Sequence, residues 1–329
     1  MPHSDKIKLL SSSISHMPLH FVFRDSGVAE KHGFELDVDI AKVPQKGKKT
    51  RTIRERAALL LSGEYHFLSG LHHEPYLYRA RGDKRLVFLA QTQNDWDDRL
   101  IVRPEIHEAA QLEGKRILTG PASCVYGNLR HALERAGVNV AKVEFVFSSR
   151  EGEGEDSRLA VGPSSIERVR RGDVDAANVD IPFDLQAKKR GLNALELPSL
   201  PVIHNTTICA STEFVRANEE TVVAFLKALI EAVHFFKSEK QKSIAILARE
   251  YAPLIGLDGD DEIEYLHAQW TRLLSAKPYP DPMAVWNLYQ LDVAHDPNAN
   301  SVAPLEVWDT HYVRKIDDSG FIDALYHGN

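Results

Sequence analysis

The chain has 329 residues, of which 43% are hydrophobic and 26% are charged. This length exceeds what one small core needs, so we expect two lobes or domains, and the average globular composition excludes large disordered tracts. The net charge of -7, from 47 acidic and 40 basic side chains, argues against a nucleic-acid-binding protein. The one basic run, at residues 46–56, indicates a solvated loop and helix start rather than a phosphate site.

The sequence has few features of a membrane protein or of a metal-binding protein. No stretch approaches the roughly 20 apolar residues that span a bilayer, so we expect no membrane insertion. The first residues, MPHSDKIKLL, lack the apolar run of a signal peptide, which favours a cytoplasmic protein, or a periplasmic one if an export signal has been removed. Cys124 and Cys209 have no close cysteine partner. We therefore expect no disulfide framework, no metal site and no cofactor.

The chain opens with the pattern of a βαβ unit. Lys6–Leu10 predicts a strand, residues 18–33 predict a helix ended by a glycine, and Phe34–Ile40 alternates apolar and acidic residues as a strand does. In open α/β sheets, ligands bind at loops that follow the carboxyl ends of strands. Three polar residues of the first such loop are candidate ligand contacts: Ser12, Ser13 and His16.

A second loop of the same kind follows. Residues 52–61 predict a helix, residues 65–68 a strand, and a proline suits the first turn of a helix that ends near residue 81. The loop before that helix supplies further candidates: Gly70, Leu71, His72 and His73. The two histidines can donate to an oxyanion or act as general acid or base near pH 7. Adjacent histidines project differently and have no carboxylate placed by spacing, so a metal role is not expected.

The stretch Glu113–Leu133 is central to a second series of elements that begins with a strand at residues 99–102. A strand at residues 116–118 runs through a Gly-Pro turn into a helix, whose free N–H groups favour a carboxylate, sulfonate or phosphate. Ser123 at this helix start is expected either to contact such an anion or to cap its own helix. Cys124 is either a nucleophile activated by the helix dipole or a small buried apolar residue.

The remaining elements complete two lobes. We predict strands at residues 85–91, 144–147 and 174–179, helices at 164–171 and 184–190, and a return crossing at 202–210. Asp180 either accepts a hydrogen bond from a ligand or caps the helix after it. The pattern is helical from residue 213 onward, at residues 221–236, 243–251, 262–274, 282–291 and 305–325. We assign residues 1–98 and 206–329 to the first lobe and residues 99–205 to the second.

This order of elements resembles the type II periplasmic-binding-protein architecture. Within it, the chain is similar to the nitrate, sulfonate and taurine binding proteins and their cytosolic relative, the thiamine-pyrimidine precursor synthase. Five stretches carry the resemblance: HGFELDVDI at 32–40, ALLLSGEYHF at 58–67, LEGKRILTG at 112–120, RRGDVDAANV at 170–179 and TTICASTEFVRANEETVVAFLKALIEA at 206–232. Together they are specific for the fold, but individually they are weak for any function.

The resemblance implies a two-lobed α/β fold with the second lobe inserted in the first and a helical C-terminal extension. It implies a ligand held in a cleft between the lobes by loops at strand ends, with hinge closure around it. It also adds His204 and Asn205, at the return crossing, to the ligand-binding candidates. If the chain is exported, the resemblance implies an ABC permease as its partner.

This sequence lacks some catalytic residues of the known enzymes of this fold, which limits the reactions that it can be expected to catalyse. The precursor synthase carries a cysteine-rich signature with paired histidines, and here no cysteine cluster accompanies His72 and His73, so that activity is not expected. The aromatic desulfinases place a nucleophilic cysteine in the loop after the first strand, where this chain has serines. A cysteine mechanism at that position is therefore excluded. The dihydroxyphthalate decarboxylases share the general plan.

Two functions remain open. The first is a substrate-binding protein that captures a small anionic ligand, carboxylate- or sulfonate-like and in one version aromatic, between its lobes. The second is a cytosolic, cofactor-free decarboxylase, desulfinase-like lyase or hydrolase that acts on an aromatic acid. In that case His72 or His73 is the general acid or base, and Cys124 is a candidate catalytic residue.

Overall fold

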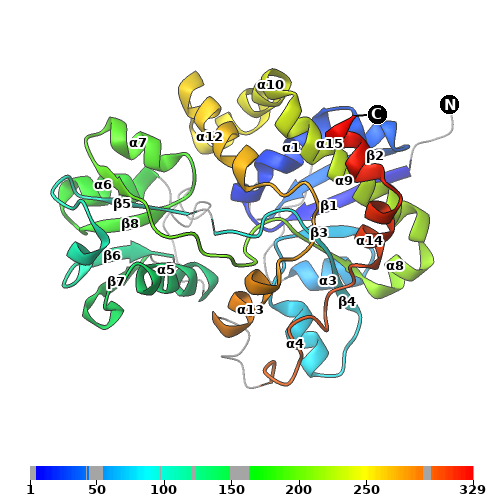
Figure 1. Cartoon of the computed structure of the whole chain (residues 1–329), viewed down its shortest axis with the longest axis horizontal. Helices are drawn as coiled ribbons and strands as arrows, with labels where there is room; N and C mark the ends of the chain where they lie inside the picture. The colour runs from blue at the N-terminus through cyan, green and yellow to red at the C-terminus, as the bar shows by residue number, and fades with distance from the viewer. Residues whose placement is uncertain are drawn as a thin grey trace.

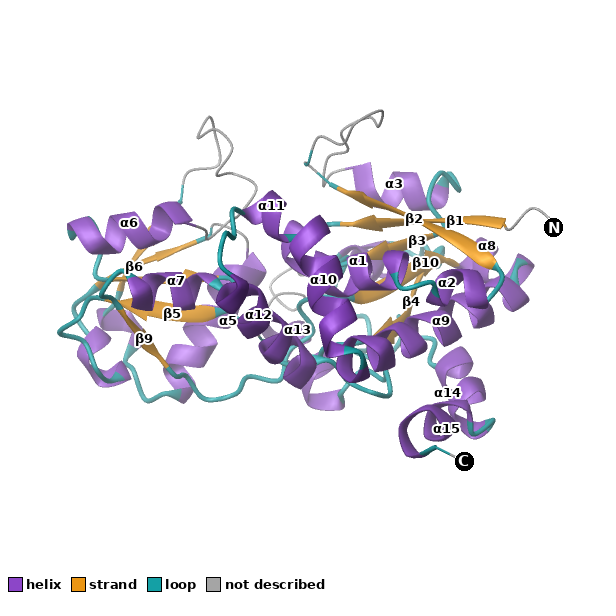
Figure 2. Cartoon of the chain, turned by 90° about the horizontal axis from the view of Figure 1, so that it is seen from above, coloured by secondary structure: helices purple, strands orange, loops and turns teal. Residues whose placement is uncertain are grey.

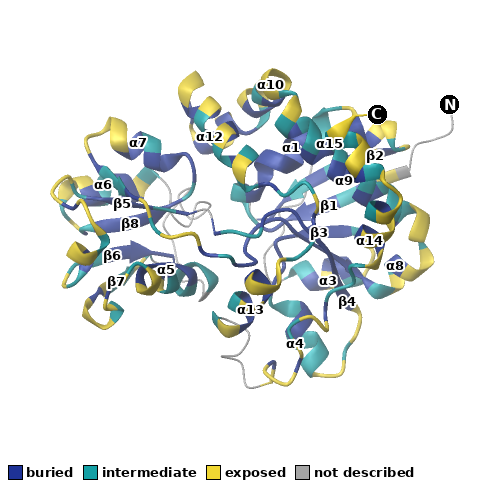
Figure 3. Cartoon of the chain, viewed as in Figure 1, coloured by how far each residue is buried: buried dark blue, intermediate teal, exposed yellow. Residues whose placement is uncertain are grey.

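The computed structural model describes residues 5–41, 43, 55–96, 98–120, 123–148, 163–291 and 298–328. These residues form two five-stranded sheets with helices packed around them (Figure 1). Buried residues follow the strands of both sheets, and exposed residues gather on the outer faces of the helices (Figure 3). The architecture is the two-lobed α/β arrangement that the sequence predicts.

The first sheet has the strand order β2-β1-β3-β10-β4. β1 pairs parallel with β2 and β3, so that Leu9 lies opposite Val38 on one side and Phe67 on the other. β10 runs antiparallel between β3 and β4. The strands of this sheet are β1 (Asp5–Ser11), β2 (Phe34–Ile40), β3 (Phe67–Ser69), β4 (Leu86–Gln91) and β10 (Thr207–Ser211).

The second sheet has the strand order β7-β6-β8-β5-β9. β6 pairs parallel with β7 and β8, whereas β5 is antiparallel to β8 and β9. Its strands are β5 (Arg99–Val102), β6 (Arg116–Thr119), β7 (Glu144–Phe147), β8 (Ala176–Val179) and β9 (Asn193–Leu195). The chain enters this sheet after β4 and leaves it before β10, so the second sheet is inserted in the first lobe. The lobe boundaries at 98/99 and 205/206 fall in these two connections and stay predictions.

Helices surround both sheets. Those between strands are α1 (Met17–Asp25), α2 (Val28–Lys31), α3 (Arg56–Leu61), α4 (Glu74–Ala80), α5 (Ser123–Arg135), α6 (Pro163–Arg171) and α7 (Phe183–Lys189). Those after β10 are α8 (Thr212–Ala217), α9 (Glu219–Ser238), α10 (Lys240–Glu250), α11 (Ala252–Ile255), α12 (Asp260–Leu273), α13 (Pro282–Leu291), α14 (His311–Asp318) and α15 (Phe321–His327). None of the described helices is both long and apolar enough to cross a membrane.

The single helix predicted at residues 18–33 is wrong, because the structure has two helices there. Gly27 separates α1 from α2 with a φ of 79°, a left-handed conformation that glycine adopts without steric cost. The Ser26 hydroxyl accepts a hydrogen bond from the Val28 N–H at 3.4 Å and so supports the start of α2. The glycine at position 27 is therefore a second helix-ending signal, ahead of the one at position 33.

The helix α9 confirms the predicted apolar stripe. Val222, Phe225, Leu226, Leu229, Val233 and Phe236 are all buried. Phe225 stacks on Phe67 of β3 with ring centroids 3.8 Å apart, so this helix covers one face of the first sheet. The last two helices, α14 and α15, pack against α9 on the outside of the first lobe.

Two C-terminal helices also reach the second lobe. α12 packs against α7, and α13 packs against α5, so both lie between the two halves of the molecule (Figures 1 and 2). Lys189 at the end of α7 pairs with Asp261 at 2.8 Å and with Glu262 at 3.2 Å on α12. The helical extension therefore connects the lobes as well as covering the first one.

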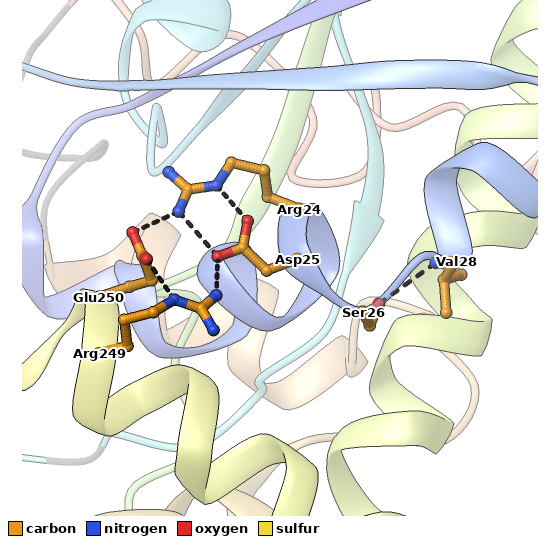
Figure 4. A network of polar contacts seen from close by, with 6 residues as sticks. All are labelled: Arg24, Asp25, Ser26, Val28, Arg249 and Glu250. Carbon is orange, nitrogen blue, oxygen red and sulfur yellow. Dashed lines mark hydrogen bonds and ion pairs between the residues drawn. The ribbon is translucent and has the colours of Figure 1, made fainter.

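A network of four charged residues joins α1 to α10 (Figure 4). Arg24 binds Asp25 and Glu250, both at 2.6 Å, and Arg249 binds the same two carboxylates, both at 2.7 Å. Burial tends to raise the pKa of Asp25, but the hydrogen bonds and charges of Arg24 and Arg249 outweigh it and lower that pKa. The pKa of Glu250 shifts in the same direction for the same reasons.

We expect Asp25→Asn to lower the free energy of unfolding at pH 7 by about 1–2 kcal/mol, because two guanidinium groups lose a charged acceptor. The folded-state pKa of Asp25 lies below its unfolded value. Its stabilisation is therefore present above about pH 4 and is lost as the pH falls through the folded-state pKa. Urea unfolding at pH 7 and at lower pH should show the two proteins converging in acid.

Asp318→Asn is the matched control for this prediction. Asp318 pairs with Arg314 on the surface, where the two side chains are 68% and 67% exposed. An exposed pair of this kind contributes about 0.5 kcal/mol or less. If Asp25→Asn costs no more than Asp318→Asn at pH 7, the network does not hold α1 to α10.

Candidate active site between the lobes

The first candidate loop follows β1. The Ser12 hydroxyl is buried and donates to the carbonyl oxygen of Gly70 at 2.9 Å, which joins this loop to the loop after β3. Ser13 begins the short 3-10 helix Ile14–His16 and accepts a hydrogen bond from the Ser15 N–H at 3.3 Å. Ser12 thus links two loops, whereas the bonds of Ser13 support its own turn.

Gly70 allows these loops to approach closely. Its φ is 84°, and a Cβ atom there would lie 2.2 Å from the Ser12 hydroxyl oxygen and 2.3 Å from Cε1 of His16. Leu71, the next residue, is fully buried in the hydrophobic core. These two residues anchor the loop, and the side chains that it presents are the two histidines that follow.

Four histidines and one cysteine converge at this point. We call His16, His72, His73, His204 and Cys124 the histidine–cysteine cluster. The His72 ring lies 5.2 Å from the His73 ring and 6.0 Å from the His204 ring, measured between centroids. The Cys124 sulfur lies within 4.8 Å of a ring nitrogen of His72 and of His73, and His204 also acts on the Cys124 thiol. Because Cys124 belongs to α5 after β6 and His73 follows β3, the cluster is built from both lobes.

Burial keeps the inner histidines of the cluster uncharged at neutral pH. His16 is 4% exposed and His72 is 8% exposed. Removal from water lowers the pKa of each far below the usual histidine value, and the neighbouring histidines and Arg56 lower it further. His16 also hydrogen-bonds with the side chain of Asn205. These imidazoles therefore act as neutral donors and acceptors.

Cys124 is the group that carries negative charge most readily. Burial opposes ionisation of its thiol, but hydrogen bonds and charge from His204 and His73 outweigh this effect and lower the pKa to about 6. The fully buried Cys209 behaves in the opposite way, because burial dominates and raises its thiol pKa. Cys209 lies in the core, and Cys124 is half-buried beside the cluster.

An ion pair flanks the cluster. Arg56 donates to Glu74 at 2.6 Å and to the carbonyl oxygen of Gly70 at 3.3 Å, and its side chain is only 12% exposed. The assignment of residue 56 to a solvated run is therefore wrong. Leu59 and Leu60, three and four residues later, are buried on the same helix face, and this spacing was the available signal. Residues 44–54 of the basic run lie outside the described residues.

The other candidates are placed as follows. Ser123 is the first residue of α5, as expected, but its side chain lies outside the described residues. Asp180 follows β8, and its carbonyl oxygen accepts a hydrogen bond from the Phe183 N–H at 2.9 Å in the turn before α7. A ligand contact from either residue stays a prediction. Asn205 lies beside His16, and its contact with a ligand, which the resemblance implies, stays a prediction.

A thiol among imidazoles has three chemical uses. The imidazole N–H groups donate hydrogen bonds to an anion, the Cys–His contacts suit nucleophilic or acid–base chemistry, and nitrogen and sulfur atoms ligate transition metals. In the described part of the chain, only one group of histidine, cysteine, aspartate or glutamate residues has metal-ligand spacing, and it consists of His72, His73 and Cys124.

Comparison with known proteins identifies the class first as the periplasmic-binding-protein fold. The putative periplasmic sulfonate-binding protein SsuA from Methylobacillus flagellatus KT superposes with a TM-score of 0.66 at 14% identity, covering 97% of this chain and 96% of that one. SsuA from Escherichia coli, which binds aliphatic sulphonates, gives 0.61 at 16% identity over 94% and 91%. The desulfurization enzyme DszB gives 0.62 at 15% identity over 96% and 99%. At these identities the likeness shows the fold, as predicted.

The family follows from the sequence. The model of the NMT1/THI5-like family matches residues 28–243, which is more than half of the chain, so the chain belongs to this family. The resemblance that the five sequence stretches predicted is thereby confirmed. Curated protein sequences give no significant match.

We expect Gly70→Ala to destabilise the protein by about 1–3 kcal/mol more than Gly63→Ala. Both glycines have positive φ, but a Cβ at position 63 meets nothing within 4 Å. The difference therefore reports the clash with Ser12 and His16. Urea unfolding measures it, and equal losses in the two variants would contradict a tight approach of the two loops at Gly70.

Proposed function

We propose that the chain binds a small anionic ligand, carboxylate- or sulfonate-like, between its two lobes at the histidine–cysteine cluster. One observation carries this proposal: the sulfur of Cys124, on a helix of the second lobe, lies within 4.8 Å of ring nitrogens of His72 and His73, which follow β3 of the first lobe. A ligand at this point contacts groups from both lobes. Its binding energy can therefore stabilise one arrangement of the lobes over another.

The donors around this point suit an anion. Imidazole N–H groups come from His73 and His204, and the 13-residue helix α5 begins one residue before Cys124, with the positive end of its dipole at that point. Hydrogen bonds to a charged acceptor contribute about 1.5–3 kcal/mol each. A few such bonds, with an apolar ligand body packed beside them, support binding in the micromolar range.

The related structures agree with this ligand class. Two of them are named as sulfonate-binding proteins, and a mutant of the desulfurization enzyme DszB has been crystallised in complex with biphenyl-2-sulfinic acid. All of these ligands combine an oxyanion with an apolar body. In a transport role, the chain would deliver such a ligand to an ABC permease.

We expect the purified chain to bind at least one member of a panel of aromatic carboxylates, alkyl and aryl sulfonates and aryl sulfinates in a calorimetric titration. His73→Ala should weaken that binding about 10-fold or more, because an anion loses a hydrogen-bond donor. His327→Ala is the matched control, since His327 is exposed on the last helix, α15. Absence of binding across the panel, or equal affinity in the two variants, would contradict the proposal.

A second candidate is an enzyme that cleaves an aromatic acid, with a cluster histidine moving the proton. The specific observation in its favour is that the Cys124 sulfur lies within 4.8 Å of ring nitrogens of His72 and His73. Such contacts are the usual arrangement by which a histidine activates or reprotonates a reacting group. The loop after β1 contains serines and no cysteine, so Cys124 is the candidate for a cysteine nucleophile in this site.

If the chain is an enzyme, aromatic carboxylates or sulfinates incubated with it should yield a product of lower mass, detected by mass spectrometry. His73→Ala should then reduce turnover by about 10²–10⁴-fold, the usual contribution of a general acid or base. His327→Ala should retain full turnover. Calorimetric binding without any product would rule this candidate out, and full turnover in both His72→Ala and His73→Ala would remove the proton-transfer role.

A further inference from the structure

We propose that Cys124, His72 and His73 form a binding site for a divalent transition-metal ion of the zinc class. One ligand atom from each residue, the cysteine sulfur and a ring nitrogen of each histidine, lies within 4.8 Å of the other two. In a tetrahedral zinc site with bonds of about 2.0–2.3 Å, ligand atoms lie roughly 3.3–3.8 Å apart. Side-chain shifts of about 1 Å therefore complete the site.

A second observation points to the same ion. His72 is 8% exposed, and its Nδ1 atom is buried without a hydrogen-bond partner in the described part of the chain. A buried polar atom that makes no hydrogen bond destabilises a fold. A metal ion bound through Nδ1 would satisfy this atom, and one ring nitrogen of His72 is among the three ligand atoms that lie close together.

The donor set selects the kind of ion. Two imidazole nitrogens and one thiolate sulfur favour zinc and similar transition metals, whereas magnesium and calcium prefer carboxylate and carbonyl oxygens. None of the three residues carries a carboxylate. The nearby Glu74 is bonded to Arg56 and is not one of the three.

Three protein ligands leave one tetrahedral position open. Zinc sites with three protein ligands bind water or a substrate at the fourth position, whereas structural sites are closed by four. The His204 ring lies 6.0 Å from the His72 ring, measured between centroids, where it can orient a metal ligand from outside the coordination sphere. We infer a metal that presents one exchangeable position between the lobes.

The sequence led us to expect no metal site, because His72 and His73 are adjacent and lack a nearby third ligand. The third ligand comes from the other lobe, 51 positions after His73 in the chain. The metal therefore ties the loop after β3 to the start of α5. It binds whether or not an organic anion is present, so this inference does not depend on the proposed ligand.

The test uses the whole chain, stripped of metal with EDTA and dialysed, in buffer without any organic acid ligand. Titration with Co²⁺ should give one ion per chain and a thiolate-to-cobalt charge-transfer band. Titration with Zn²⁺ followed by calorimetry should give the same stoichiometry. Cys124→Ser should abolish the charge-transfer band, and both Cys124→Ser and His72→Ala should weaken Zn²⁺ binding by at least about 10–100-fold.

Controls separate this site from other causes. His327→Ala should bind both ions like the wild type. Cys209 remains in Cys124→Ser, so a band that persists in that variant assigns the thiolate to Cys209 and overturns the proposal. Circular dichroism of each variant, with Cys124→Ala as a second variant that lacks this thiol, distinguishes a lost ligand from a lost fold. A wild-type chain without the band, or without stoichiometric Zn²⁺ binding, also overturns it.

Discussion

The two connections between the sheets fix how the two lobes are placed, because they run side by side and are hydrogen-bonded to each other. Gln91 donates from its side-chain amide to the carbonyl oxygen of Asn205 at 2.7 Å, and the hydroxyl groups of Thr92 and Thr206 are joined at 2.7 Å. Thr206 has a φ of 54°, which costs a β-branched residue about 1–3 kcal/mol. The bonds to the neighbouring connection hold this conformation, and with it the position of His204 beside Cys124.

The C-terminal helices add a second constraint on the lobes. Glu262 of α12 is buried and receives bonds from Gln186 at 3.3 Å and Lys189 at 3.2 Å, both on α7 of the second lobe. On another side of the site, α13 packs against α5, the helix that carries Cys124. Closure about the two connections must therefore carry α12 and α13 along with the second lobe or exchange their contacts. A rotation that breaks the bonds to Glu262 leaves a buried carboxylate without its partners, which resists opening in that direction.

Local patterns in the sequence were sufficient for the fold. The alternation in Phe34–Ile40, the apolar stripe of α9, and the strand β6 and helix α5 on either side of residues 121–122 all depend on neighbours within a few residues, and all are confirmed. Contacts across the chain were not readable in this way. The meeting of His73 with Cys124 depends on how the two lobes sit together, and the pairing of Arg56 with Glu74 makes the end of the basic run part of a half-buried ion pair. Contacts between residues so far apart in the sequence cannot be predicted from the spacing of residue types.

Charge balance at the cluster relates the proposed ligand to the proposed metal. Arg56 and Glu74 offset each other, and the cluster itself contains no carboxylate and no lysine or arginine. When Cys124 coordinates a metal it does so as a thiolate, and a bare thiolate repels any carboxylate or sulfonate that approaches within a few ångströms. A divalent ion reverses this balance, because it leaves a net positive charge of one at the site after the thiolate is counted. The open coordination position and the neighbouring imidazole N–H groups then both favour binding of an anion. One set of residues can therefore serve both as a metal site and as the recognition point for an acidic ligand.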